Sequence, residues 1–279
     1  MKNAHTRLAP LITGLAFTLT IGALAQGPPP PLGPPPVPPQ NQITPAKAIL
    51  GKALFWDEQL SSSSTVSCGT CHQPAAGGGD PRNQGDMRNP GVDGILGTPD
   101  DILGSLGVAR TDANGDYQPH GVFGHDRQVT SRATPSNLMG AYFSELFWDG
   151  RATSEFTDPL TGNVVIPSGG ALESQSLAPI LSSAEMANDG RSWSDVTSKL
   201  ETVEPLAVAF NLPGDLSAAL AGGVTYPDLF QAAFGTAEIT PVRIGLALAT
   251  YQRTLVPNQT PWDSFTSGNQ GALSQGQQA

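Results

Sequence analysis

The two cysteines of this 279-residue chain stand close together and are followed directly by a histidine. They are Cys68 and Cys71, and His72 completes a C-x-x-C-H motif. A disulfide at this spacing would close a very small loop and would constrain little of the unfolded chain. Structural stapling is therefore a poor explanation for the pair, and the motif indicates a bound group.

The C-x-x-C-H motif serves three chemistries. In a c-type haem site, both thiols form thioethers to the porphyrin and His72 ligates the iron. A zinc site needs two further ligands, for which His120 and His125 are candidates. A redox dithiol of thioredoxin type would stand between a strand and a helix. No βαβ pattern surrounds Cys68 and the two histidines lie far beyond zinc-finger spacing, so haem c is favoured while the other two readings stay open.

The N-terminus has the composition of an export signal. Lys2 and Arg7 precede the mostly apolar stretch Leu8–Leu24, and Ala25 completes an A-x-A cleavage site. Residues 1–25 are therefore predicted to be a signal peptide cleaved after Ala25, which implies a periplasmic protein. A retained membrane anchor is the alternative.

A proline-rich segment follows the predicted signal. Residues 26–42 include nine prolines, which fix φ and remove backbone donors. This composition predicts an extended polyproline II linker. The globular part is expected to begin at Ile43.

The rest of the chain predicts a mainly α fold with long Gly/Pro/Asp-rich loops and little sheet. Thr-Pro pairs at Thr44 and Thr240 are typical of helix starts, with Thr as the N-cap and Pro at the first helical position. Further helices are expected at Pro135–Tyr142, Trp193–Val203 and Pro227–Phe234. The best strand signal is a small hairpin within Gly162–Gly169.

The charge balance excludes one class of partner. The chain has 14 basic and 24 acidic residues and a formal net charge of −10. Nucleic-acid binding would need basic stripes, so no nucleic-acid partner is expected.

One acidic turn has the spacing of a calcium loop. Asp112, Asn114 and Asp116 occupy positions 1, 3 and 5 of such a loop. The glycine expected at position 6 is Tyr117, and the glutamate expected at position 12 is Phe123. The turn is thus a candidate calcium site, with a plain acidic turn as the alternative.

Five stretches together resemble the bacterial dihaem cytochrome c peroxidases and their dihaem oxidase relatives. They are Leu50–His72, Gly124–Leu138, Leu146–Arg151, Ser174–Met186 and Ala247–Val256.

The resemblance implies two cytochrome-c-like domains, each with a haem. Residues 43–256 would form the N-terminal peroxidatic haem domain, and residues 257–279 the start of a truncated second one. The chain has no second C-x-x-C-H motif. One haem c is therefore expected in this chain and two in a full-length protein, of which the sequence is expected to be a fragment.

The resemblance also implies the haem ligands. Cys68 and Cys71 match the covalent attachment site, and His72 matches the proximal iron ligand. His125 matches the distal ligand, which must leave before peroxide can reach the iron. The spacing to the following Thr-Pro motif favours His125 over His120.

Three further residues match functional positions of the family. Trp148 matches the tryptophan on the electron path between the haems. Gln175 and Glu185 match the distal-pocket pair, where a carboxyl with a tuned pKa transfers a proton and a neutral amide holds peroxide. Core packing for Trp148 and an ordinary solvated position for the other two are the alternatives.

The function implied is an exported c-type cytochrome that reduces hydrogen peroxide to water. Its electrons would come from a second haem or from a small soluble donor such as a cytochrome c or a copper protein. A homodimer is one expected assembly. The alternatives are a non-catalytic haem c electron carrier and a dihaem oxidase that acts on another substrate.

Overall fold

The computed structural model describes residues 30–84 and 88–278. The predicted signal peptide lies outside the described residues. Residues 32–258 form one compact unit, and residues 259–279 belong to another, whose helices are α8 (Pro261–Thr266) and α9 (Gln275–Gln278). Within the described ranges, no helix has the length and apolar character needed to cross a membrane.

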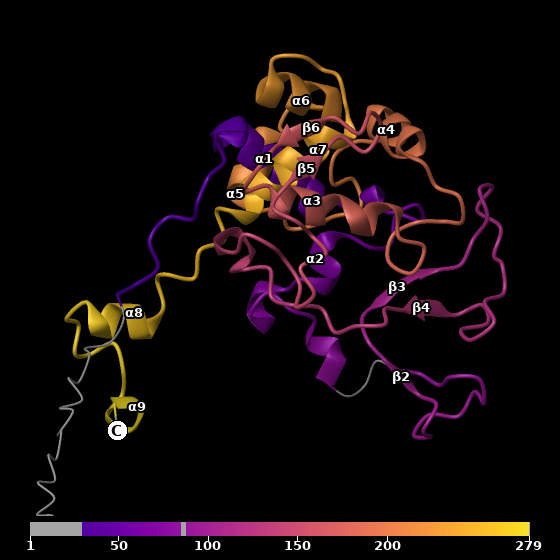
Figure 1. The fold of residues 1–279 in the computed structure, drawn as a ribbon, viewed down its shortest axis with the longest axis horizontal. Helices are drawn as coiled ribbons and strands as arrows, with labels where there is room; N and C mark the ends of the chain where they lie inside the picture. Colours follow the sequence, from indigo (N-terminus) through magenta and orange to yellow (C-terminus); the bar gives the residue numbers. More distant parts are fainter. Residues whose placement is uncertain (1–29, 85–87, 279) are drawn as a thin grey trace, which may run out of the picture. The chain divides into compact units, whose positions relative to one another are not determined.

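The larger unit is mainly helical, as predicted (Figure 1). Its α-helices are α1 (Pro45–Trp56), α2 (Cys68–Cys71), α3 (Ala171–Leu177), α4 (Trp193–Thr202), α5 (Gly214–Ala219), α6 (Tyr226–Phe234) and α7 (Pro241–Gln252). The two Thr-Pro starts are confirmed: the Thr44 and Thr240 side chains accept hydrogen bonds from the backbone amides of Lys47 and Arg243, both at 3.2 Å. The helices predicted near α4 and α6 are also present.

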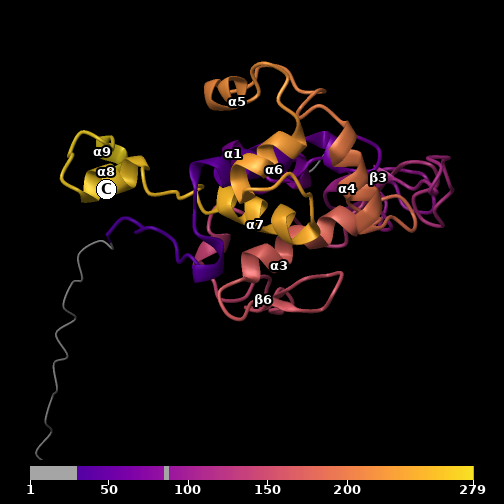
Figure 2. The same cartoon turned by 90° about the horizontal axis from the view of Figure 1, so that it is seen from above.

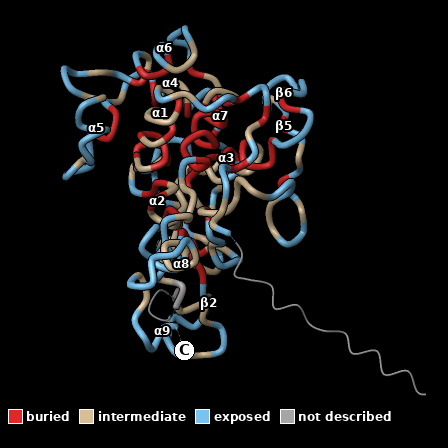
Figure 3. Tube along the Cα trace, turned by 90° about the vertical axis from the view of Figure 1, so that its left-hand side faces the viewer, coloured by how far each residue is buried: buried red, intermediate tan, exposed pale blue. Residues whose placement is uncertain are grey.

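Helices α1 and α7 pack directly on each other, and α3 packs on α7 (Figure 2). Gly51 makes the α1–α7 approach possible, because a Cβ at this position would overlap the carbonyl oxygen of Ala247. Figure 3 shows buried residues concentrated along α1, α3 and α7. This three-helix arrangement forms the frame of the domain.

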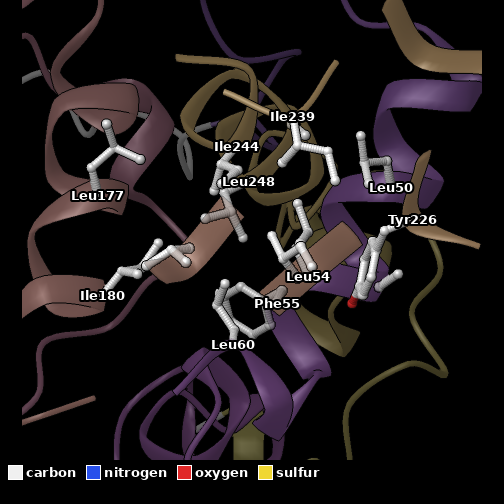
Figure 4. Close-up of a cluster of buried hydrophobic side chains, with 14 of the residues drawn as sticks. Leu50, Leu54, Phe55, Leu60, Leu177, Ile180, Tyr226, Ile239, Ile244 and Leu248 are labelled. Carbon is white, nitrogen blue, oxygen red and sulfur yellow. The ribbon is translucent and has the colours of Figure 1, made fainter. Parts of the chain in front are cut away.

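The hydrophobic core lies between these helices and α6. Figure 4 shows Leu50, Leu54 and Phe55 of α1 facing Ile244 and Leu248 of α7. Burial of such side chains contributes roughly 1.5–3 kcal/mol each. The core therefore holds α1, α6 and α7 together.

The described sheets are three two-stranded antiparallel pairs. They are β1 (Arg88–Asn89) with β2 (Ile102–Leu103), β3 (Leu106–Ala109) with β4 (Arg127–Val129), and β5 (Phe156–Thr157) with β6 (Val164–Ile166). The predicted hairpin within Gly162–Gly169 supplies β6, but its partner strand lies earlier in the chain. The small amount of sheet agrees with the predicted fold class.

The prediction of a helix at Pro135–Tyr142 is wrong. Only a short 3-10 turn at Gly140–Tyr142 is present. The Ser136 hydroxyl donates to the Gly77 carbonyl at 2.6 Å, and the Asn137 amide donates to the Gly78 carbonyl at 3.2 Å. Hydrogen bonds to a distant loop thus replace those of a helix.

The end of the proline-rich segment packs on the domain. Asn41 is buried, and its amide donates to the Glu173 carboxylate at 2.8 Å and to the Leu246 carbonyl at 2.9 Å. The Arg253 guanidinium donates to the Pro36 carbonyl at 3.3 Å. The compact unit accordingly begins at Leu32 and not at Ile43, and this part of the segment is not a free linker.

Candidate functional site

The C-x-x-C-H motif opens onto a cavity of about 930 Å³. This volume lies within the range of about 300–1,000 Å³ that is usual for small-molecule and cofactor sites. Six residues predicted from the sequence line it: Cys68, Cys71, His72, Trp148, Gln175 and Glu185. Apolar side chains complete the wall, among them Phe55, Val66, Pro179, Met186 and Leu248.

Helix α2 is the single turn that presents both cysteines. The Ser67 amide donates to the Thr70 hydroxyl at 2.9 Å, which caps the turn. A Cβ at Gly69 would overlap the indole ring of Trp56, so only glycine allows α2 to lie this close to α1. The Trp56 indole N–H in turn donates to the Tyr251 hydroxyl at 2.9 Å. The motif is thus held against both long helices.

The His72 ring is oriented by the backbone. Its Nδ1 lies 3.0 Å from the Gly78 carbonyl oxygen, to which the Asn137 amide also donates. Since a carbonyl can only accept, Nδ1 carries the proton of the neutral ring and Nε2 has the lone pair, while the Pro135 backbone also interacts with the ring. Burial lowers the pKa of His72. A neutral imidazole with its second nitrogen available is the form that binds metals.

The two thiols are not in a disulfide. Burial, followed by the neighbouring Cys71 sulfur, raises the pKa of Cys68 to about 12. Burial also raises the pKa of Cys71. Redox dithiols depend on a lowered pKa, and here the shift is in the opposite direction. The redox-dithiol alternative is therefore disfavoured.

His120 and His125 do not line the cavity. Both lie in the loop between β3 and β4, where His125 is exposed. The His120 ring stacks on Phe123, and its Nδ1 accepts the amides of Val122 and Phe123 at 3.1 and 3.3 Å. Among the described residues, no three His, Cys, Asp or Glu side chains converge as a metal site. The zinc alternative, which needs the cysteines and these histidines together, is not formed.

The Asp112 turn is closed by its own backbone. The Asp112 carboxylate accepts the amides of Asn114 and Asp116 at 2.9 and 3.0 Å, and the Gln118 side-chain amide at 3.2 Å. These bonds are those of an acidic turn. The calcium site stays a prediction.

Gln175 and Glu185 reach the cavity from adjacent segments. Gln175 lies on α3, and Glu185 lies in the loop that follows the 3-10 turn Ala178–Leu181. Both are half-buried. Burial raises the pKa of Glu185, although the Ser182 hydroxyl and the Arg151 charge act in the other direction. A carboxyl of this kind can release and accept a proton nearer to neutral pH than an exposed glutamate.

Trp148 lies at the edge of the cavity and is 85% exposed. The Arg132 guanidinium lies 5.3 Å from the centre of its ring and is paired with Asp149 at 3.0 Å. Arg151 also pairs with Asp149, at 2.9 Å. Arg132 and Arg151 both line the cavity; neither is among the site residues predicted from the sequence, although each lies in one of the five stretches that resemble the family.

The residues present fit a haem c. Two free thiols and a neutral imidazole lie in one largely apolar wall, which is the donor set for two thioether bonds and an iron ligand. Arg132 and Arg151 can pair with the carboxylates that such a porphyrin carries.

The comparison with protein families decides the assignment. The family model described as di-haem cytochrome c peroxidase matches residues 45–271. The chain belongs to that family. The resemblance drawn from the five stretches is therefore confirmed.

Similar proteins include members with different names. The methylamine utilization protein MauG of Methylophilus methylotrophus is 30% identical over 240 residues, which are 86% of this chain and 49% of that protein. The cytochrome c551 peroxidase of Nitrosomonas europaea is 26% identical over 243 residues, 86% of this chain and 50% of that protein. This chain thus spans about half the length of each of these relatives.

A solved structure has a similar fold. The crystal structure of a MauG-like protein associated with microbial copper homeostasis aligns with a TM-score of 0.50 at 20% identity. The alignment covers 90% of this chain and 51% of that one. The mainly helical architecture is thus that of the family.

Proposed function

We propose that this chain is the peroxidatic, haem-binding part of an exported c-type cytochrome that reduces hydrogen peroxide to water. The observation that carries the proposal is the common cavity of Cys68, Cys71 and His72 with Gln175 and Glu185. Membership of the di-haem family supports haem c as the group bound there. Cys68 and Cys71 would attach it covalently, and His72 would ligate its iron through Nε2.

The reaction consumes one hydrogen peroxide, two electrons and two protons and yields two waters. When bound, the haem would supply a redox-active iron that passes these electrons to the peroxide. Glu185 as a carboxylate takes the proton from one peroxide oxygen and returns it to the other, so that the O–O bond breaks with a neutral leaving water. Gln175 holds peroxide or water by hydrogen bonds without adding charge. These steps need Glu185 unprotonated when peroxide arrives.

The electrons would come from a second haem in the full-length protein, or from a small soluble cytochrome c or copper protein. Trp148, exposed at the cavity edge, is suited to lie on that path. His125 would be the distal ligand that leaves before peroxide binds. A periplasmic location and a homodimer complete the proposal.

Oxidation of another substrate is the second candidate. It is favoured by the similarity to MauG, which is named for methylamine utilization and matches 86% of this chain. In that case the same cavity would use peroxide as the oxidant, and the electrons would come from the second substrate. A purely electron-carrying cytochrome is less favoured, because it would have no use for Gln175 and Glu185 in the cavity.

The first test is a count of covalent haem. The full chain is exported in a host with a cytochrome c maturation system, and intact mass and the pyridine haemochrome spectrum are measured. One haem is expected, and the Cys68→Ala/Cys71→Ala variant should carry none. Unmodified protein from a host that loads a control cytochrome would contradict the proposal.

The second test measures hydrogen peroxide consumption by the loaded chain with a reduced cytochrome c or a small chemical reductant. Glu185→Gln should lower the rate by roughly 10²–10⁴-fold, the usual contribution of general acid–base catalysis. Glu201→Gln, at an exposed position of α4, is the matched control and should keep the parental rate. Equal rates in Glu185→Gln and the parent would contradict the role of Glu185.

A further inference from the structure

The Glu185 side chain is carried by a tight turn. The amides of Glu185, Met186 and Ala187 all donate to the Ser182 carbonyl, at 3.0, 2.9 and 2.9 Å. Three donors on one oxygen leave the other carbonyls of the turn without partners inside it. Two of those carbonyls, of Ser183 and Met186, accept hydrogen bonds from side chains outside the turn.

Gln128 binds the turn from the β3–β4 hairpin. Its side chain is 4% exposed, and its Nε2 donates to the Ser183 carbonyl at 2.7 Å and to the Val108 carbonyl at 3.4 Å. Gly107 on β3 lies against the same turn, because a Cβ there would overlap the Ala184 carbonyl oxygen. The hairpin thus packs directly on the backbone of the residue before Glu185.

Arg191 binds the turn at Met186 and the segment before it at Ile180. It is 9% exposed, and its Nη1 donates to the carbonyls of Ile180 and Met186 at 3.1 and 3.2 Å. The Ser62 amide also donates to the Met186 carbonyl, at 2.8 Å. Burial lowers the pKa of Arg191 to about 10, a sign of how far this cation is removed from water. A buried cation is costly unless its hydrogen bonds are made.

Neither Gln128 nor Arg191 is among the described residues that line the cavity. Each nevertheless donates a side-chain hydrogen bond to a backbone carbonyl of the turn that carries Glu185. We propose that Gln128 and Arg191 are positioning residues that hold the Glu185 carboxyl at the place where peroxide is cleaved. The inference rests on the proposed function, and it adds two residues that act on Glu185 through its backbone.

The size of the effect follows from geometry. Proton transfer to a bound substrate needs heavy atoms within hydrogen-bond reach, and a displacement of about 1 Å can cost roughly 10²-fold in rate. Gln128→Met keeps the volume of the side chain but removes the donor to Ser183. Arg191→Met does the same for Ile180 and Met186, and Arg191→Lys keeps the charge should the first variant not fold.

The first readout is hydrogen exchange by mass spectrometry on the haem-loaded full chain. In Gln128→Met and in the Arg191 variants, peptides that cover residues 182–187 should exchange faster by roughly tenfold or more, since a buried hydrogen bond is lost. Peptides from α7 should keep the parental rate. Gln231→Met is the control for the substitution itself, because Nε2 of this exposed side chain donates to the Gly235 carbonyl at 2.7 Å, far from the turn along the chain.

The second readout is a double-mutant cycle with Glu185→Gln, followed by the rate of hydrogen peroxide consumption. Gln128→Met should lower the rate about 10²-fold when Glu185 is present and have little further effect in Glu185→Gln. A general loss of structure would instead lower both backgrounds equally. Unchanged exchange at residues 182–187, or equal losses in the two backgrounds, would overturn the inference.

The two readouts separate this inference from the proposed function. If the parent consumes no peroxide, the proposed function fails, and the positioning role for peroxide cleavage fails with it. If the parent consumes peroxide and Glu185→Gln lowers the rate, an unchanged exchange rate would overturn the positioning role alone. Faster exchange together with a non-additive cycle would support both.

Discussion

The carboxylate of Glu173 accepts two hydrogen bonds from the guanidinium of Arg253, at 2.6 and 2.9 Å, and both side chains are buried. The Asn41 side-chain amide donates to the same carboxylate, and its Oδ1 accepts from the Lys47 ammonium at 3.0 Å. The proline-rich segment, α1, α3 and the end of α7 therefore meet at one buried polar network. Because α3 carries Gln175 and α7 carries Leu248, this network fixes two walls of the cavity.

Loss of one member of this pair should be strongly destabilising. Arg253→Met leaves the Glu173 carboxylate buried without its cation and should lower the free energy of unfolding by about 3–5 kcal/mol. The Glu173→Gln/Arg253→Met double variant should lose less than Arg253→Met alone. Urea unfolding followed by circular dichroism measures both. Arg110→Met, whose 2.8 Å ion pair with Asp189 joins two side chains that are 39% and 38% exposed, should cost under about 1 kcal/mol.

Gly51→Ala should destabilise the domain although alanine is the better helix former. The added methyl group would overlap the Ala247 carbonyl and force α1 and α7 apart, at a cost of about 1–3 kcal/mol. Gly214→Ala on α5 is the control, because its Cβ would meet no atom within 4 Å. Thermal unfolding should show a lower Tm for the first and an equal or higher Tm for the second. Equal Tm values would contradict the close α1–α7 contact.

The proposed peroxide reaction should have an acid limb set by Glu185. Burial raises the pKa of this carboxyl above its ordinary value of 4.5. The rate should therefore fall as the pH drops through that raised pKa, since a protonated Glu185 cannot accept the peroxide proton. Glu185→Gln should be slow at every pH and lack the limb. A parental limb that persists in Glu185→Gln would assign it to another group.

The same shift has a consequence for stability. A pKa raised on folding means that the folded chain binds the proton more tightly than the unfolded chain. The contribution of the protonated Glu185 to the free energy of unfolding is fully present below the pKa of the unfolded chain. It is lost as the pH rises through the pKa of the folded chain. Glu185→Gln should therefore remove one source of destabilisation near neutral pH, which unfolding curves at several pH values can measure.

His125 and His120 should respond differently to substitution in the haem-loaded chain. His120 is held in its own turn by two backbone amides, whereas His125 is exposed in the same loop. We expect His125→Ala to convert a six-coordinate low-spin absorption spectrum into a high-spin one, and His120→Ala to leave the spectrum unchanged. The reverse pattern would make His120 the distal ligand, and two unchanged spectra would exclude both.

Much of the frame could be predicted because its signals are local. At the Thr-Pro starts of α1 and α7, the threonine side chain caps an amide only three residues further on, so the local sequence is enough to predict these starts. The C-x-x-C-H motif likewise fixes three cavity residues within one short stretch. The prediction of Gln175 and Glu185 as site residues depends on the resemblance alone, since glutamine and glutamate are also common at solvated positions without a function.

The predictions that are wrong concern segments whose hydrogen-bond partners lie far away in the sequence. The helix expected at Pro135–Tyr142 is replaced by hydrogen bonds to Gly77 and Gly78, which no local pattern announces. Composition places Asn41 in a linker, yet its side-chain amide donates a hydrogen bond to Glu173, 132 positions away. The roles of Gln128 and Arg191 are of the same kind, because a buried side chain that binds a distant carbonyl has no sequence signature.

The contact between α1 and α7 also sets an order of events in biosynthesis. Trp56 and Tyr251, which bond across it, are 195 positions apart, so this side of the domain is built only after most of the chain has been synthesised. Cys68 and Cys71 emerge long before Leu248 and Gln252, which complete the cavity wall. The two thiols can therefore be reached by a group for as long as α7 has not docked, and the docking of α7 then adds Leu248 and Gln252 to the wall beside that group.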